Sequence, residues 1–342
     1  MKALTILLPL LICCSAAAEN DSSSAALRVA FWNVENYFDI YPDSTHLASN
    51  QRWTPRRFAQ KRNNIYKTVA AMEFPAVVGL AEVENALVLR ELTLGTPLRL
   101  MNYGFVHYES PDRRGIDNAL LYRADRFTPF VQQALYVADT AEGFFTRDIL
   151  FVGGVTCGGD TLLLLVNHFP SRLGGDIADR HRQTVAAKLR VIMDSLAAAC
   201  PNAGIIVMGD FNAEPSDPVI RGITPEGAPY VNLMSGNVEA AFMVDNGPQS
   251  VSKQGVPRGW GSYKYHGYWS FIDQIIVSDN MVGKAASVNL TVDGCAAHVF
   301  NAPFLLCNDK GYMGKRPYRT WHGPSYQGGF SDHLPVYIDL KR

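Results

Sequence analysis

Short apolar runs along the chain predict buried β-strands. They are rich in Val, Ile, Leu and aromatic residues and recur from residue 27 to the C-terminus: LRVAFWNV, AVVGLAEV, NALLYR, TLLLLVNHF, GIIVMGDF, FIDQIIVS and LPVYIDL. Several of these runs are too continuously apolar to leave one face in water. They therefore indicate sheets that are covered on both faces.

Between these runs, apolar residues repeat with a helical period. The clearest example covers 176–199, where the spacings of four, three and four are typical of one helix face: Val185, Leu189, Ile192 and Leu196. Cys200-Pro201 ends this pattern. A second helix is predicted to begin with Thr54 as N-cap and Pro55 as its first residue, and to end before Pro75.

Intermixed strands and helices favour an α/β fold in layers with mixed sheets. Residues 221–268 and 294–330 differ, because Gly, Pro, Tyr and Trp are frequent there and periodicity is weak. Long loops of this kind in a compact domain are usually functional or disordered, and the aromatic content argues against disorder. No break in composition marks a second domain, so we expect a single domain over 27–342.

The N-terminus reads as an export signal rather than as part of the fold. MKALTILLPLLICCSAAAEND combines one Lys, an apolar stretch and small residues ending at Ala18. The stretch is shorter than the roughly 20 residues of a membrane span, and no other segment qualifies as transmembrane. We expect a signal peptide at 1–18, a linker at 19–26, and a periplasmic or extracellular protein. A lipoprotein anchored through Cys13 or Cys14 is less favoured, because neither follows a small residue.

Composition sets broad limits on the partners. The chain has 342 residues, 47% hydrophobic and 18% charged, with a formal net charge of -1. Nothing in this balance indicates a tight hold on a polyanion, although a local basic patch is compatible with it. Removal of the signal peptide would leave four cysteines, and an oxidising compartment favours disulfides between them. We expect Cys157 to pair with Cys200 and Cys295 with Cys307, although four cysteines allow three connectivities and all three stay open.

Polar residues stand directly at the ends of the apolar runs. In VMGDFN, Asp210 and Asn212 follow a buried strand, and other runs repeat the pattern with acids, amides and imidazoles: Asn33, Glu35, Glu82, Asn167, His168, Asp273, Asp332 and His333. Each could be a turn or a satisfied structural group taken alone, and we interpret Glu84 and Asn85 only as a turn. Their repetition at strand ends predicts a common site.

The residue types in this set favour a hard divalent cation. Carboxylates and amides suit Mg²⁺, with Mn²⁺ or Ca²⁺ also compatible, and the set lacks the thiolates of structural zinc sites. Such a cation stabilises charge that develops during displacement at phosphorus. Asp210 could orient or deprotonate the attacking water, and His333 could bind or protonate the phosphoryl group while Asp273 holds its tautomer.

The motifs NVEN, GLAEVEN, NHFPS, GDFN, SFIDQ and SDHLP, in this order, resemble those of the endonuclease/exonuclease/phosphatase superfamily, the group of pancreatic deoxyribonuclease and the abasic-site endonucleases. The resemblance extends from about residue 27 to the C-terminus. It implies a four-layered α/β sandwich in which two mixed β-sheets pack face to face between helices, with the site at one edge.

The resemblance also implies residue roles. Glu82 would be the main metal ligand, and three residues would assist it: Asn33, Glu35 and Asp332. Asp210 and Asn212 would handle the water and the scissile phosphate, His333 and Asp273 would form a histidine–carboxylate pair, and His168 would match the second histidine of the deoxyribonuclease branch. Relatives differ on whether an Asp or a His is the base, so that assignment stays open.

Substrate-binding residues are expected among the basic loop residues. Arg114 precedes a strand in RRGIDNALLYR, Arg172 follows NHFPS, and guanidinium groups suit phosphate. Asn167 of NHFPS joins this set. Aromatic residues of WGSYKYHGYW could stack on nucleobases, although we expect Trp269 to pack in the core.

These observations predict an exported, metal-dependent phosphodiesterase, in the first place an endonuclease-like nuclease whose partner is a phosphoester and possibly nucleic acid. Hydrolysis of a phospholipid (sphingomyelin or a phosphoinositide) is the alternative, and a non-catalytic surface binding module is the second. No obligate protein partner is evident. A serine hydrolase is disfavoured because no Gly-x-Ser-x-Gly elbow occurs.

Overall fold

The computed structural model describes residues 26–41, 53–139, 142–235, 260–283 and 286–342. Two large sheets dominate this part of the chain. The sheet we call the β1 sheet has the order β15 (Thr291–Val292), β21 (Val336–Lys341), β1 (Leu27–Tyr37), β2 (Val77–Val83), β4 (Asp117–Arg123) and β3 (Tyr103–His107), with β16 (His298–Val299) also paired to β21. The β10 sheet has the order β11 (Tyr230–Asn232), β14 (Asp273–Ser278), β10 (Gly204–Asp210), β9 (Thr161–His168), β8 (Ile149–Thr156) and β5 (Phe127–Leu135).

The remaining elements are helices and short hairpins. The α-helices are α2 (Pro55–Ala71), α3 (Ala86–Leu94), α4 (Gly175–Ala199) and α5 (Pro218–Ile223), and the 3-10 helices are η1 (Pro97–Met101), η2 (Asp279–Met281), η4 (Asp293–Cys295) and η5 (Pro303–Leu305). The hairpins are β6 (Ala138–Asp139) with β7 (Phe144–Phe145), β12 (Tyr263–Tyr265) with β13 (Tyr268–Ser270), β17 (Leu306–Asn308) with β18 (Lys315–Pro317), and β19 (Trp321–His322) with β20 (Ser325–Tyr326).

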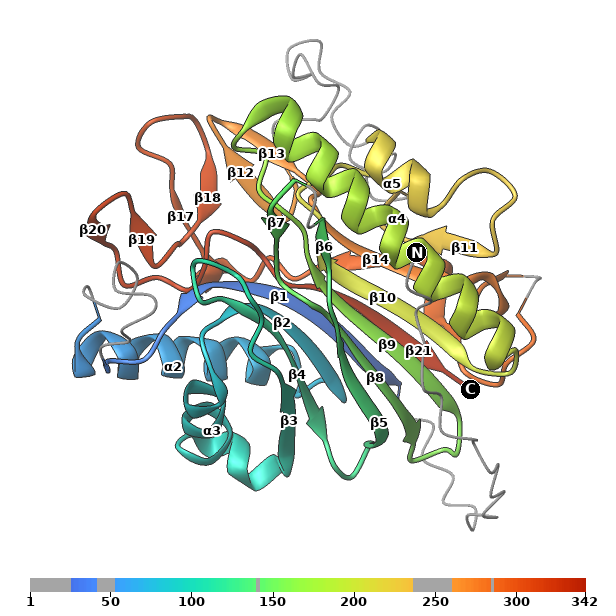
Figure 1. The fold of residues 1–342 in the computed structure, drawn as a ribbon. Coiled ribbons are helices and arrows are strands. Elements are labelled where there is room, and N and C mark those ends of the chain that lie inside the picture. Colours follow the sequence, from blue (N-terminus) through green and yellow to red (C-terminus); the bar gives the residue numbers. More distant parts are fainter. Residues whose placement is uncertain (1–25, 42–52, 140–141, 236–259, 284–285) are drawn as a thin grey trace.

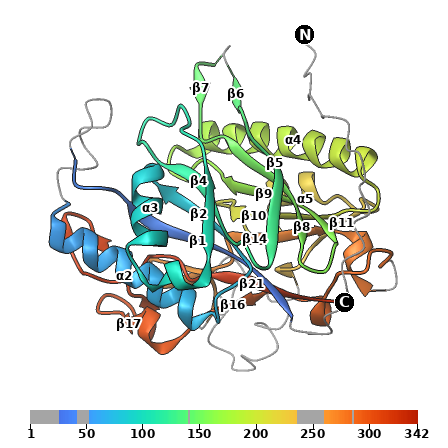
Figure 2. The same cartoon turned by 90° about the horizontal axis from the view of Figure 1, so that it is seen from below.

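These elements form four layers. Figure 1 shows α4 across the outer face of the β10 sheet, with α2 and α3 on the opposite side of the molecule against the β1 sheet. In the view from below, α4 and α2 again lie on opposite sides of the two sheets (Figure 2). The predicted four-layered α/β sandwich is therefore confirmed. Among the described residues, no helix is long and apolar enough to span a membrane.

Alternation along the strands explains why the apolar runs have no polar face. On β1, Val29 and Phe31 point into the core between the sheets, whereas Ala30 and Trp32 pack towards α2 and α3. β1 thus buries both faces, and full burial of a side chain such as Phe31 contributes about 1.5–3 kcal/mol.

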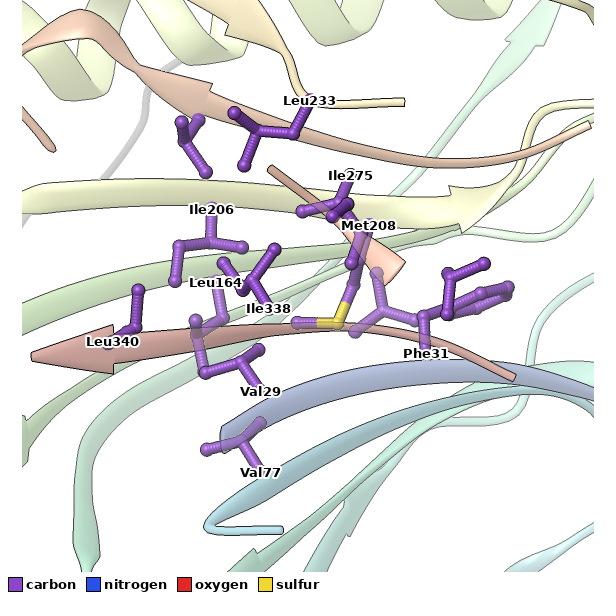
Figure 3. Packing of buried hydrophobic residues seen from close by; sticks show 14 of the residues in the cluster. Val29, Phe31, Val77, Leu164, Ile206, Met208, Leu233, Ile275, Ile338 and Leu340 are labelled. Atoms are coloured by element: carbon purple, nitrogen blue, oxygen red, sulfur yellow. The ribbon is translucent and has the colours of Figure 1, made fainter. Parts of the chain in front are cut away.

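The β10 sheet shows the same division. Ile206 and Met208 join the core between the sheets, and Ile205 and Val207 pack with the apolar face of α4. In Figure 3, Met208 reaches from its strand towards Phe31 and Val29 of the facing sheet. A Cβ atom at Gly79 would lie 2.8 Å from the Met208 sulfur, so the Met208 side chain packs over Gly79 in space that a larger residue would occupy.

The helix ends follow local chemistry. Thr54 caps α2 by accepting a hydrogen bond from the Arg57 amide, with Pro55 in the first turn as predicted. The long helix α4 begins at Gly175, one residue before the predicted start. The turn interpretation of Asn85 is wrong, because its side chain accepts bonds from the Leu87 and Val88 amides and caps α3.

Strand direction gathers the strand ends at one edge of each sheet. β1 is parallel to β2 and β9 is parallel to β10, so their C-terminal ends lie together. β21, β14 and β4 run antiparallel to these neighbours, so their N-terminal ends lie at the same edge. Every polar strand-end residue picked out from the sequence therefore belongs to one edge of its sheet.

The two aromatic-rich regions and the cysteines differ from the expectations. Residues 221–268 and 294–330 contain α5 and several short strands instead of loop alone, and 236–259 lie outside the described residues. The expected disulfides are wrong for this structure, in which Cys157, Cys200, Cys295 and Cys307 are thiols. The four belong to separate elements of the fold, and a disulfide requires two Cα atoms within about 7 Å. The expected signal peptide lies outside the described residues.

Candidate active site

Side chains from both sheets meet at the edge where the strands end. The Asn33 amide of the β1 sheet donates a 3.0 Å hydrogen bond to Asp210 of the β10 sheet. His333, just before β21, lies with its Nδ1 2.9 Å from Asp273 of β14 and its Nε2 3.6 Å from Asp210. Four sequence-distant residues thus form one continuous cluster that bridges the two sheets.

Asp210 is the centre of this cluster. It is 2% exposed, and its second carboxylate oxygen accepts the Asn212 amide at 2.9 Å. Burial raises the pKa of Asp210 to about 6; His333 acts in the opposite direction, and Asp273 adds to the rise. Near neutral pH the carboxylate is therefore ionised but within reach of proton transfer.

His333 is held in place from every side. Its backbone carbonyl accepts the Trp32 indole at 2.9 Å, and the Tyr263 ring lies 4.7 Å from the imidazole, centroid to centroid. Burial opposes the charged form, but Asp273 and Asp210 outweigh it and raise the pKa of His333 well above its usual value. The imidazole is thus cationic near neutral pH and can donate from Nε2.

His168 has the opposite electrostatic character. Its Nε2 lies 3.7 Å from Asp210, but burial, followed by the charges of Arg147 and Arg114, lowers the pKa of His168 well below its usual value. The buried Nδ1 of His168 and the buried Oδ1 of Asn167 have no hydrogen-bond partner. Both atoms lie at strand ends on the β10-sheet side of the cluster, and each retains hydrogen-bonding capacity there.

Glu82 lies on the β1-sheet side of the cluster. Its φ of 64° is left-handed, which is strained for a non-glycine residue and turns the side chain away from the regular strand course. The carboxylate accepts the Asn36 amide at 2.9 Å and lies 3.3 Å from the Arg114 guanidinium. The predicted ligand and one predicted substrate-binding arginine are therefore in direct contact.

Glu35 also has a left-handed backbone, with φ of 53°. Its carboxylate accepts the amides of Thr320 at 2.6 Å and Trp321 at 3.1 Å, and Arg319 lies 3.4 Å away. The same Arg319 lies 2.8 Å from Asp332. Burial and the charge of Asp332 raise the pKa of Glu35 to about 7.

The other predicted residues lie at the margin of the cluster. Asn212 has a left-handed φ of 48° and donates from its side chain to the Phe169 carbonyl. Exposed Arg172 donates to the Asn212 carbonyl at 2.8 Å, so it is close to the cluster but does not touch its carboxylates.

Sequence reasoning missed three cationic residues of the site: Lys61, Arg147 and Arg319. Lys61 of α2 is 1% exposed and donates to Thr320 Oγ1 at 2.6 Å and to the Phe330 carbonyl at 2.5 Å. Burial lowers the pKa of Lys61 to about 8. Its position four residues before Ile65, on the apolar stripe of the helix, was the available signal.

The oxygen donors fit a hard divalent cation. Glu35, Glu82 and Asp332 bring three carboxylates to the region where Arg114, Arg319 and Lys61 supply positive charge, and oxygen-only donor sets suit Mg²⁺. Among the described residues, these three carboxylates do not place ligand atoms within 4.8 Å of one another, whereas Asp210, Asp273 and His333 do. A cationic His333 has no lone pair to offer a metal, so this group suits proton transfer better.

One further group of possible ligands lies nearby on the β1 sheet. His107, Glu109 and Asp117 also place ligand atoms within 4.8 Å of one another. Asp117 accepts hydrogen bonds from the Ser110 amide and hydroxyl, and His107 lies 3.2 Å from it. These bonds already explain the group as an anchor of the loop before β4.

Comparisons with known proteins agree with this geometry. The profile described as "Endonuclease/Exonuclease/phosphatase family" matches residues 28–342. A search of curated proteins finds no match. The human nocturnin catalytic domain with bound sulfate superposes with a TM-score of 0.57 at 17% identity, covering 92% of this chain and 94% of that one.

Two further solved structures are similar over nearly their full length. TDP2 from D. rerio, complexed with a single-strand DNA product, gives a TM-score of 0.56 at 16% identity and covers 93% of this chain and 100% of its own. A mannosyl-6-phosphatase from Bacteroides thetaiotaomicron gives 0.56 at 17% identity, with 92% and 100% coverage. At these identities the likeness establishes a shared fold.

Proposed function

Because the chain belongs to the endonuclease/exonuclease/phosphatase family of phosphoester hydrolases, we propose that it is an exported, divalent-metal-dependent phosphodiesterase of the nuclease type. The motif resemblance of the sequence to this superfamily is confirmed. The observation that carries the proposed chemistry is the bridge between the sheets, in which Asp210 lies between Asn33, His168 and His333.

Asp210 acts as the general base in this proposal. Its pKa of about 6 leaves it ionised at neutral pH, and the Asn33 and Asn212 bonds fix its orientation. The neighbouring carboxylates raise the pKa of His333, which favours its protonated form and supports Asp210 as the base. The His333 Nε2 instead donates to a phosphate oxygen and stabilises the charge that develops there, while Asp273 keeps the ring protonated and oriented.

Neutral His168 and Asn167 bind the phosphate from the β10 sheet. Both are buried, and each has one polar atom without a partner. The Nδ1 of His168 can donate to a phosphate oxygen when it carries the proton, whereas the Oδ1 of Asn167 is an acceptor and would reach the phosphate only through a water. Asn212 positions the water and the phosphate, and Arg114 and Arg172 supply positive charge around them. These groups leave no need for a covalent intermediate on the protein.

Glu82 and Asp332 would hold the divalent cation, with Asn33 and Glu35 in support. A bound Mg²⁺ supplies Lewis-acid stabilisation of the phosphoryl charge. We propose Mg²⁺, with Mn²⁺ as a functional substitute and Ca²⁺ as a less favoured ion. The existing bonds of Glu35 to two backbone amides and Arg319 make it the least available of the carboxylates.

Aromatic side chains beside the cluster support a nucleic acid substrate. Tyr263 contacts His333, and Tyr265, two residues along the same strand, is 58% exposed. Exposed aromatic rings stack on unpaired bases without regard to sequence. Trp269 is 6% exposed and belongs to the core, so it does not contribute. A fold neighbour, TDP2, was solved with a single-strand DNA product.

An activity panel tests the substrate and the metal together. The mature chain is assayed on single- and double-stranded DNA, RNA, sphingomyelin, a phosphoinositide and a chromogenic diester, with Mg²⁺, Mn²⁺ or a chelator. We expect metal-dependent cleavage of nucleic acid and no activity with the chelator. Cleavage of only a phospholipid would establish the alternative, and absence of all hydrolysis would favour a binding module.

Export is tested on the full chain. Expression in a Gram-negative host is expected to yield a mature protein that begins at Glu19 in the periplasm or the medium. A labelled acyl chain on Cys13 or Cys14 would establish lipoprotein anchoring instead.

A further inference from the structure

The Arg319 guanidinium forms ion pairs with Glu35 and Asp332, two of the carboxylates proposed as metal ligands. Arg319 lies in the segment between β18 and β19, and its guanidinium lies 3.4 Å from Glu35 and 2.8 Å from Asp332. Glu35 is 3% exposed, whereas the Arg319 side chain is 29% exposed. A positive charge therefore lies where two acids, one of them deeply buried, would otherwise repel each other.

We propose that Arg319 is an internal counter-ion that competes with the divalent cation for Glu35 and Asp332, and that metal binding releases it to bind the substrate phosphate. This inference rests on the proposed function, because it takes these carboxylates as the metal site.

Hydrogen bonds hold the backbone around Arg319 in place, independently of its guanidinium. The Thr320 and Trp321 amides bind Glu35, and the Arg319 carbonyl accepts the Gly329 amide at 3.2 Å. The segment thus keeps its position when the guanidinium leaves the acids.

Lys61 cannot take this role. Its ammonium group also interacts electrostatically with Glu35 and Asp332. However, Lys61 is buried, and its ammonium donates hydrogen bonds to Thr320 Oγ1 and to the Phe330 carbonyl. Lys61 is therefore fixed beneath the site, whereas the partly exposed Arg319 side chain is the one that a cation can displace. The guanidinium also presents the fork geometry that matches two phosphate oxygens.

Competition predicts an opposite effect on metal binding and on phosphate binding. Removing Arg319 leaves Glu35 and Asp332 without one neutralising charge, so the metal-free protein is destabilised and the metal binds more tightly. The same removal deprives the metal-loaded protein of one phosphate ligand. A purely structural role for Arg319 would weaken both kinds of binding.

The test uses the mature chain with Arg319→Met and, as a matched control from the preceding strand, Arg316→Met. Calorimetric titration with Mn²⁺ alone is expected to show about tenfold tighter binding for R319M, or ~1.4 kcal/mol, and no change for R316M. Titration with inorganic phosphate in the presence of Mg²⁺ is expected to show weaker binding for R319M. Arg319→Lys, which keeps the charge, is expected to restore Mn²⁺ affinity towards the wild-type value.

Unchanged or weaker Mn²⁺ binding by a folded R319M would overturn the counter-ion role. If R319M does not fold, Arg319→Gln and Arg319→Lys replace it, and equal Mn²⁺ affinity of these two would overturn the role as well. Failure of the wild-type chain to bind Mn²⁺ at all would overturn the proposed metal site together with this inference. If the wild-type chain binds Mn²⁺ and hydrolyses diesters but R319M binds Mn²⁺ with unchanged affinity, the counter-ion role fails while the proposed function stands.

Discussion

The middle and the end of the same strands are equally buried but chemically opposite. On β1, Phe31 is 0% exposed and Glu35, four residues later, is 3% exposed. On β10, Met208 and Asp210 are 0% and 2% exposed. The middle faces apolar side chains of the opposite sheet, whereas the end faces acids, amides and imidazoles from it.

This difference shows how one scaffold separates stability from chemistry. In the middle, burial of apolar surface stabilises the fold. At the end, burial raises the pKa values of Asp210 and Glu35 and lowers that of His168, whereas neighbouring carboxylates raise the pKa of His333 against the effect of burial. Hydrogen bonds and ion pairs offset the cost of burying these groups. Substitutions at the strand ends should therefore lower turnover, whereas substitutions in the strand middles should lower the free energy of unfolding.

The largest expected effect is on turnover at the end of β10. Asp210→Asn should lower kcat by at least ~10²-fold, because the amide cannot accept the proton. Its stability at pH 7 should equal or exceed that of the wild type: a carboxyl whose folded pKa is raised contributes stability at low pH and loses that contribution as pH rises through about 6. Asp339→Asn, which alters the Arg28 pair on the outer part of β21, is the control and should retain activity. Full activity of D210N would remove Asp210 from the base role.

A large effect on stability is expected from the middle of β9. Leu164→Ala should lower the free energy of unfolding by ~2–5 kcal/mol, because it leaves a cavity between the sheets. Denaturant unfolding measures this loss, and activity per folded molecule should stay near the wild-type value. Leu100→Ala, at a residue 73% exposed, should change stability by no more than about 0.5 kcal/mol. Equal losses in both variants would contradict the core assignment.

A moderate effect is expected on the pH dependence. In the wild type, kcat/KM should rise with pH as Asp210 ionises, with a pKa near 6, and fall when His333 loses its proton well above its usual pKa. Asp273→Asn removes a charge that raises the pKa of His333, so the alkaline limb should move to lower pH while the acid limb also shifts slightly downward. An alkaline limb that stays in place would show that it does not report His333.

The smallest effect is expected at a helix cap that lies outside both regions. Asn85→Ala should cost ~1 kcal/mol, because the Leu87 and Val88 amides of α3 lose their acceptor. Thermal unfolding measures the loss. Because Asn85 also donates to Asp39, Asn85→Asp, which keeps the cap but replaces the donor, separates the two contributions.

The sequence predicted the parts of the fold whose residues carry a local signal. The continuously apolar strands and the helices α2 and α4 follow from periodicity and caps. β5 was missed because it lies at the sheet edge with alternating exposure and a register shift at Pro129, and β3 because it is a short edge strand. The buried strand β8 was also missed, and its run ILFVGGVT is interrupted by two glycines, which weaken the strand pattern. The expected disulfides rested on compartment and spacing, which do not determine distances between elements.

The site was predictable only where a motif ends a strand. Asn33, Glu82, Asp210 and His333 stand out because polar groups interrupt apolar runs. Lys61 and Arg319 come from a helix and from a hairpin connection, and only the packing of α2 against residues 318–330 brings them to the carboxylates. Their cationic role is a property of the tertiary structure.

The most direct measurement is the anomalous scattering of Mn²⁺ in crystals of the mature chain. The account predicts a Mn²⁺ peak bonded to Glu82 and Asp332, with Arg319 turned away from Asp332. A peak bonded instead to Asp210, Asp273 and His333, or no peak in crystals of an active enzyme, would contradict it.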